Sequence, residues 1–209
     1  MTNKFVIANR PESLNHRSAR KAGANQLRII GGQWRSRRLS VAAVPGLRPT
    51  PERVRETLFN WLQSDVAGSR CLDLFAGSGA LGLEALSRGA ASVIFVEKNK
   101  QAYQQLQANI HSLQAEGAQL FRHDALTVLK AEQVPFDLIF LDPPFHQDWP
   151  KRILDLIVAG ALLHPASMVY LEHEMSYKLN PQDWGLEIYR ETHAGEVYSC
   201  LLKPIVSTS

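Results

Sequence analysis

From residue 70 onward, short apolar runs rich in β-branched and aromatic residues alternate with longer segments of helical spacing. Strands that alternate with helices are typical of a parallel, doubly wound sheet. The predicted strands are residues 71–75, 92–97, 119–122, 137–141 and 168–172. The predicted helices are residues 80–87, 100–113, 125–130 and 150–159.

The last segment of the chain departs from this alternation. Two strand-like runs, residues 185–192 and 196–202, are separated only by His193, Ala194 and Gly195. Because three residues leave no room for a crossover helix, the two runs are predicted to form an antiparallel hairpin. The fold class is therefore predicted to be α/β, with a mostly parallel sheet that ends in this hairpin.

Two further elements are predicted in front of the sheet. Residues 27–42 contain two β-like runs around Gly31 and Gly32, and we interpret them as a basic β-hairpin. The segment GLRPTPERVRETLFNWL then predicts a helix that Thr50 caps and Pro51 opens. Apolar residues at helical spacing form its predicted packed face, namely Val54, Leu58, Trp61 and Leu62. The predicted outward residues are Arg53, Arg55 and Glu56.

The net charge of +3 hides an uneven distribution, because residues 1–55 hold 12 of the 23 basic residues and only 2 of the 20 acidic ones. A basic segment joined to an acidic body favours binding to a phosphate backbone. The first 26 residues lack an amphipathic apolar face, which favours nucleic acid over a membrane surface. The residues expected to contact the nucleic acid are Arg35, Arg37, Arg38, Arg48, Thr50 and Arg53.

These patterns predict a flexible basic arm (1–26), an RNA-facing hairpin and helix (27–66), one α/β domain (67–204) and a tail (205–209). No apolar run approaches the roughly 20 residues that span a bilayer, and none near the start resembles a signal peptide. We therefore expect a cytoplasmic protein. Cys71 and Cys200 lie far apart in apolar runs, and the histidines have no metal-ligand spacing, so neither a disulfide nor a metal site is expected.

A glycine-rich loop follows the first predicted strand of the domain. Gly77, Gly79 and Gly82 have GxGxxG spacing, which allows a tight turn, a close ligand and free N–H groups at a helix start. Glu97 ends the next strand, where an acid binds ribose hydroxyls in dinucleotide folds. This pair of features is compatible with NAD.

A second acid changes that preference. Asp73 lies at the end of the first strand, where it would repel a pyrophosphate but favour a cofactor with an amine and a sulfonium, so S-adenosyl-L-methionine is the preferred cofactor. Asp124, after the third strand, can accept from the adenine amino group or cap the next helix. The expected cofactor contacts are Asp73, Phe75, Gly77, Gly79, Glu97, Lys98, Asp124 and Ala125.

The buried strand FDLIFL ends in Asp142, Pro143, Pro144 and Phe145. The lone pair of an exocyclic nucleobase amine is delocalised, so it attacks poorly unless acceptors grip its hydrogens and turn it toward an electrophile. Asp142 and the Pro143 carbonyl are the predicted acceptors, and Phe145 is predicted to stack on the base. We therefore predict that these four residues are the catalytic motif.

These motifs resemble the Rossmann-like, class I S-adenosylmethionine-dependent methyltransferases that act on amino groups. With RIIGGQWRSRRL and GLRPTPERVRETLFNWL in front, the chain resembles the RsmD-type bacterial 16S ribosomal RNA guanine-N2 methyltransferases. The resemblance implies a seven-strand sheet, transfer of one methyl group to a guanine N2 of the guanine-966 type, and a partly assembled small ribosomal subunit as substrate. We also expect a monomer.

Three other functions remain open. Many amino-methyltransferases have Asn in place of Asp142, so adenine-N6 methylation of RNA or DNA is an alternative. An NAD-type oxidoreductase would share the glycine loop but give residues 142–145 no role. A non-catalytic RNA-binding module would bind RNA without methyl transfer.

Overall fold

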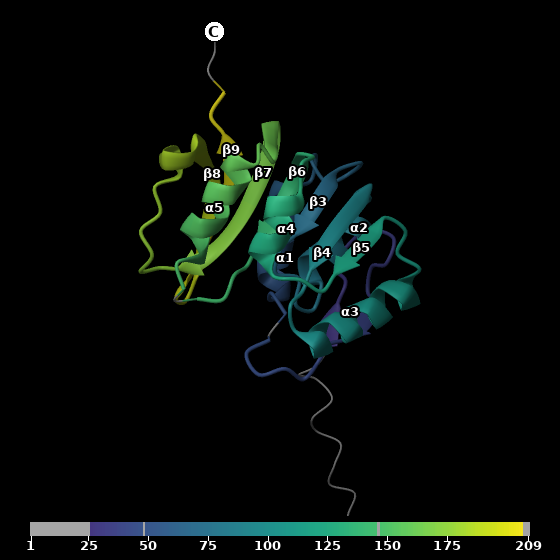
Figure 1. The fold of residues 1–209 in the computed structure, drawn as a ribbon. Coiled ribbons are helices and arrows are strands. Elements are labelled where there is room, and N and C mark those ends of the chain that lie inside the picture. Colours follow the sequence, from purple (N-terminus) through teal and green to yellow (C-terminus); the bar gives the residue numbers. More distant parts are fainter. Residues whose placement is uncertain (1–25, 48, 146, 207–209) are drawn as a thin grey trace, which may run out of the picture.

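The structure is a computed structural model that describes residues 26–47, 49–145 and 147–206 (Figure 1). Its centre is a seven-stranded sheet with the order β5-β4-β3-β6-β7-β9-β8. The first five strands in that order are parallel, and β9 is antiparallel to both of its neighbours. The strands are β3 (Arg70–Asp73), β4 (Ser92–Val96), β5 (Ala118–Phe121), β6 (Phe136–Leu141), β7 (Leu163–Glu174), β8 (Leu186–Ala194) and β9 (Val197–Pro204). The predicted fold class is confirmed.

Helices cover both faces of the sheet. One apolar core lies between the sheet and α1 to α3, and a second lies between the sheet and α4 and α5, which are in front of the strands in Figure 1. The helices are α1 (Glu52–Trp61), α2 (Ala80–Ser87), α3 (Lys100–Leu113), α4 (Ala125–Ala131), α5 (Trp149–Ala159) and the short η1 (Pro181–Trp184). Among the described residues, no helix is long and apolar enough to cross a membrane.

The strand order fixes where a ligand can bind. The chain steps outward in one direction from β3 to β4 and β5, and in the other from β6 to β7. Loops at the carboxyl ends of β3 and β6 therefore diverge to opposite faces of the sheet and leave a crevice between them. The glycine loop follows β3, and Asp142 follows β6.

The predicted basic hairpin is present as β1 (Gln26–Arg28) and β2 (Arg38–Ser40). It is attached to α2 through the buried carboxylate of Glu84. Glu84 Oε2 accepts from the backbone N–H of Ile30 at 2.9 Å, and Oε1 accepts from that of Gly31 at 2.7 Å. The hairpin is thus held against the helix that begins at the glycine loop.

The predicted basic arm, residues 1–26, lies outside the described residues except for Gln26, which begins β1.

Two predictions about α1 are wrong. Its N-cap is Pro51, not Thr50, and no side chain forms a capping hydrogen bond. Thr50 is buried instead, and its carbonyl accepts from Arg55 Nε at 3.1 Å. Arg55 was expected to point outward, but it is 1% exposed because its guanidinium forms an ion pair with Glu84. Helical spacing cannot reveal a buried partner 29 residues away.

The terminal hairpin is confirmed, with a shorter turn at Gly195 and Glu196. β7 begins earlier than predicted, at Leu163 rather than Met168. His164 and Pro165 in this extension do not read as a buried strand. Ser167 nevertheless ties it to β6, because its hydroxyl donates to Phe136 O at 2.6 Å.

Candidate active site

One cavity of about 960 Å³ lies at the carboxyl ends of β3, β4, β6 and β7. It contains most of the residues that the sequence predicted for cofactor binding and catalysis. These lining residues are Thr50, Asp73, Phe75, Gly77, Glu97, Lys98, Asp124, Ala125, Asp142, Pro143, Pro144 and Phe145. Residues from four strand ends therefore meet in one place, as the parallel sheet requires.

The glycine loop and β4 are joined inside this cavity. Gly77 N–H donates to Glu97 Oε2 at 2.8 Å. Gly77 has a φ of 52°, and a Cβ there would lie 2.8 Å from Leu47 Cδ1. A side chain at this position would therefore be strained by the backbone and would displace Leu47, which belongs to the N-terminal extension (residues 27–66). The close approach lets a ligand lie against the loop backbone beside the Glu97 carboxylate.

Gly79 plays a different part, since it does not line the cavity. It is the N-cap of α2 with a φ of 77°, and a Cβ there would lie 2.4 Å from Leu106 Cδ1. Gly79 therefore supports the packing of α2 against α3 rather than contacting a ligand directly.

Asp73 lies beneath the loop and is 3% exposed. Its Oδ2 accepts from Gly82 N–H at 3.0 Å. The pKa of Asp73 is raised to about 7, because burial and the charge of Glu97 raise it more than the Gly82 hydrogen bond lowers it. A cationic ligand group beside Asp73 would favour its charged form.

Asp124 caps α4, because its Oδ1 accepts from Leu126 N–H at 3.0 Å. Its Oδ2 lies 3.4 Å from Lys98 Nζ, in an ion pair whose lysine is largely exposed. The capping role is thus confirmed, and Asp124 also lines the cavity beside Ala125.

The catalytic candidates lie on the other side of the crevice. Asp142 follows β6 directly, and Pro143 is buried behind it. Burial raises the pKa of Asp142 well above its usual range, and the negative charges of Glu172 and Asp73 add to this shift. Phe75, from the glycine loop, packs edge-on against Trp149 of α5 at 5.4 Å between ring centroids.

Sequence reasoning missed several lining residues. Glu172, at the end of β7, is 7% exposed and lines the cavity next to Asp142. His123, Gln147 and Trp149 line it as well, and residues of the N-terminal extension form one wall, namely Gly46, Leu47, Pro49 and Pro51. The one sequence signal for Glu172 was its position at the carboxyl end of a predicted strand.

The predicted RNA-contacting arginines do not lie in the cavity. Arg37 Nη2 donates to Ser112 O at 3.2 Å, at the C-terminal end of α3. The cavity lies by the opposite end of that 14-residue helix, which is about 21 Å long. Arg35, Arg38 and Arg53 are exposed, and Arg48 lies outside the described residues. Any RNA contact by Arg37 would therefore be remote from the target base.

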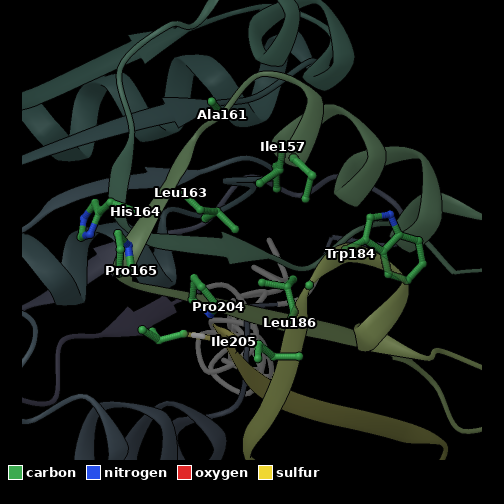
Figure 2. A pocket seen from close by; sticks show the side chains of 12 residues that line it. Ile157, Ala161, Leu163, His164, Pro165, Trp184, Leu186, Pro204 and Ile205 are labelled. Carbon is green, nitrogen blue, oxygen red and sulfur yellow. The ribbon is translucent and has the colours of Figure 1, made fainter. Parts of the chain in front are cut away.

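A second hollow of about 400 Å³ lies at the other edge of the sheet, between α5, the start of β7 and the end of β9 (Figure 2). Its walls are mainly apolar, including Ile157, Leu163 and Leu186. His164 is engaged on both ring nitrogens, with Asp137 Oδ1 and with Ala166 N–H. This hollow offers no reactive group, so the cavity at the strand ends is the candidate active site.

The described residues hold no group of three His, Cys, Asp or Glu side chains that could bind a metal ion.

Comparisons with known proteins agree with this geometry. The family described as "Conserved hypothetical protein 95" matches residues 27–203. The chain is 44% identical over 178 residues to "Ribosomal RNA small subunit methyltransferase D" of Escherichia coli strain K12, covering 84% of this chain and 89% of that protein. The chain belongs to this family. Its predicted family, and the class I methyltransferase fold, are thereby confirmed.

Solved structures extend the likeness to three dimensions. "Putative methyltransferase yhhF from Escherichia coli" is 41% identical, with a TM-score of 0.78, and the match covers 86% of this chain and 98% of that one. A 16S rRNA N2 G1207 methyltransferase of T. thermophilus, solved with AdoMet and guanosine, shares the fold at 23% identity and a TM-score of 0.67, over 86% of this chain and 49% of that one.

Membership of the class I methyltransferases also confirms S-adenosyl-L-methionine as the cofactor. The residues of the cavity fit it. Glu97 can accept from a ribose diol, buried Asp73 suits a cationic ligand group, and Asp124, which lines the cavity, can accept from an adenine amine. A pyrophosphate would meet three carboxylates here, so a dinucleotide fits the cavity poorly.

Proposed function

We propose that this protein transfers a methyl group from S-adenosyl-L-methionine to the exocyclic N2 of a guanine in small-subunit ribosomal RNA. The observation that carries the proposal is the cavity itself. It joins the glycine loop and Glu97 on one side to Asp142 and Phe145 on the other. The relatives named as small-subunit ribosomal RNA methyltransferases support the substrate class. The proposed target is a guanine of the 966 type, in an assembled or partly assembled subunit in the cytoplasm.

The bound S-adenosyl-L-methionine supplies the methyl group, and the electron pair of its broken carbon–sulfur bond stays on sulfur. Glu97 and the backbone of Gly77 hold the nucleoside end, and Asp73 lies toward the charged end. These contacts fix the donor relative to the end of β6. Most of the rate then comes from orientation, since the protein holds both reactants in line.

Asp142 and the Pro143 carbonyl accept the two N2 hydrogens, so that the nitrogen lone pair turns away from the ring. Phe145 stacks on the flipped base. The proton that N2 releases after transfer is nearest to the Asp142 carboxylate. The raised pKa of Asp142 suits it to receive that proton, although its first task is to orient the amine.

The RNA reaches the cavity past the N-terminal extension, whose Leu47, Pro49 and Thr50 line one wall. Arg37, bonded at the C-terminal end of α3, and the exposed Arg35 and Arg38 lie outside the cavity and are suited to phosphates of the folded RNA rather than to the target nucleotide. This arrangement agrees with a large structured substrate.

Incubation with radiolabelled S-adenosyl-L-methionine and small-subunit particles from cells that lack this protein tests the proposal. We expect one labelled nucleotide in 16S rRNA, identified as N2-methylguanosine by nucleoside analysis. Label at adenine N6 would replace the proposal with the adenine alternative. Binding of particles without any label would favour a non-catalytic RNA-binding module.

A further inference from the structure

Asp142 and Glu172 occupy neighbouring positions at the edge of the sheet. In the parallel pair of β6 and β7, Leu141 is paired with Leu171, so Asp142 and Glu172 are the next residues on the two strands. Neighbouring strands lie about 4.8 Å apart, and alternate residues point to the same face. Both carboxyl groups line the active-site cavity. They therefore lie side by side where the target base must enter.

Glu172 is held in a fixed orientation. Its Oε1 accepts from the hydroxyl of Tyr170 at 2.6 Å. Neither Glu172 nor Asp142 forms an ion pair with a described residue. Two adjacent carboxyl groups, one buried and one half-buried, reduce stability when no cation is beside them, which is typical of groups kept for binding or chemistry.

We infer that Glu172 selects guanine, by accepting a hydrogen bond from the N1–H of the base while Asp142 accepts from its N2 amine. The inference rests on the proposed guanine-N2 activity. On guanine, N1–H and the N2 amine are adjacent donors, and two carboxylates match that edge. Adenine presents an acceptor, N1, beside its amine, so a carboxylate at Glu172 would repel it. The acidic pair thus fits guanine and excludes adenine.

Glu172 also acts on the reaction through Asp142. Its negative charge raises the pKa of Asp142, together with burial and Asp73, and burial raises the pKa of Glu172 itself. The groups that face Asp142 are Asp73 on β3 and Tyr170 and Glu172 on β7. Removal of the Glu172 charge, with the burial of Asp142 preserved, therefore lowers the pKa of Asp142.

The test uses reconstituted small-subunit particles that carry either guanine or 2-aminopurine at the modified position. 2-Aminopurine keeps the amine, but its N1 is an acceptor without a hydrogen. Single-turnover transfer is measured with the wild-type protein, with Glu172→Gln and with Glu116→Gln, an exposed acid after α3 that serves as the control. 2-Aminopurine also lacks O6, and comparison of the guanine-to-2-aminopurine rate ratio between the protein variants cancels this contribution, because it is the same in each.

We expect wild type and Glu116→Gln to prefer guanine over 2-aminopurine by about tenfold to a hundredfold, as for a hydrogen bond to a charged group. Glu172→Gln should reduce this preference at least tenfold, because an amide N–H can pair with the 2-aminopurine N1. Its Tyr170 hydrogen bond can persist to the amide oxygen. The acidic limb of the pH profile on guanine should also move to lower pH in this variant.

An unchanged base preference and an unchanged pH profile in Glu172→Gln contradict the inference. Should that variant fail to fold, equal wild-type rates on guanine and 2-aminopurine contradict it as well. Failure of the proposed function looks different, because wild type would then not methylate the guanine particle at all.

Discussion

Arg55 Nη1 and Glu84 Oε2 form an ion pair at 3.3 Å, buried between the N-terminal extension and α2. Glu84 also accepts from Arg88 Nε at 2.8 Å and from two backbone N–H groups of the extension. The same helix begins at the glycine loop. This cluster therefore connects the proposed RNA-facing segment to the cofactor site through a single buried carboxylate.

Removal of one partner of this pair should be costly. Burial lowers the pKa of Arg55, because removal from water disfavours the charged guanidinium. The negative charge of Glu84 opposes this shift, so the ion pair offsets part of the cost of burying the guanidinium. We expect Arg55→Met to lower the free energy of unfolding by about 3 to 5 kcal/mol, as for other broken buried pairs. Urea denaturation measures it, with exposed Arg53→Met as the control. A change below 1 kcal/mol in Arg55→Met would contradict the assigned role.

Much of the fold could be predicted from periodicity. Each parallel strand lies within two residues of its predicted bounds except β7, and every α-helix was placed, whereas the short η1 was not predicted. Arg55 and Glu172 were misjudged or missed because their roles depend on partners distant in sequence, Glu84 at 29 residues and Asp142 at 30. A helical wheel or a strand pattern describes one element, whereas register and burial of charge arise only when elements pack.

The glycine loop and Glu97 make a specific prediction about cofactor binding. Glu97→Ala removes both the proposed ribose contact and the acceptor of Gly77 N–H, so we expect S-adenosyl-L-methionine affinity to fall about tenfold to a hundredfold. Glu97→Gln keeps an acceptor for Gly77 and should lose less. Calorimetry measures both, with Glu116→Gln as control. Equal affinity in all three variants would exclude Glu97 from the cofactor site.

The raised pKa of buried Asp73 predicts that the stability of the protein depends on pH. Its folded pKa, about 7, lies above the ordinary value, so the protonated form is favoured by folding. The resulting stabilisation is complete below about pH 4 and is lost as pH rises through 7. Relative to Asp73→Asn, the ligand-free wild type should therefore lose on the order of 1 kcal/mol per pH unit between pH 4 and 7. Parallel stability curves for the two proteins would contradict this.

The arginines of the basic hairpin predict an effect on substrate binding that is separate from cofactor binding. Replacement of Arg35, Arg37 and Arg38 by Ala should weaken particle binding and reduce the slope of log affinity against log salt by about 2 to 3, since each phosphate contact releases counterions. Cofactor affinity should not change, because these residues lie outside the cavity. Lys130→Ala, on exposed α4, is the control. If the triple variant shows the wild-type salt slope, the three arginines do not contact phosphates and the hairpin is only a solvated surface.

The central claim is that Asp142 orients the target amine beside the methyl donor, and single-turnover methylation of particles at saturating S-adenosyl-L-methionine tests it most directly. Asp142→Ala should slow transfer about a hundredfold or more while cofactor affinity persists. Asp142→Asn keeps an acceptor oxygen but cannot take up a proton. Substantial activity in Asp142→Asn would assign Asp142 to orientation, and near-complete loss would assign it to proton transfer. Wild-type turnover in Asp142→Ala would contradict the account.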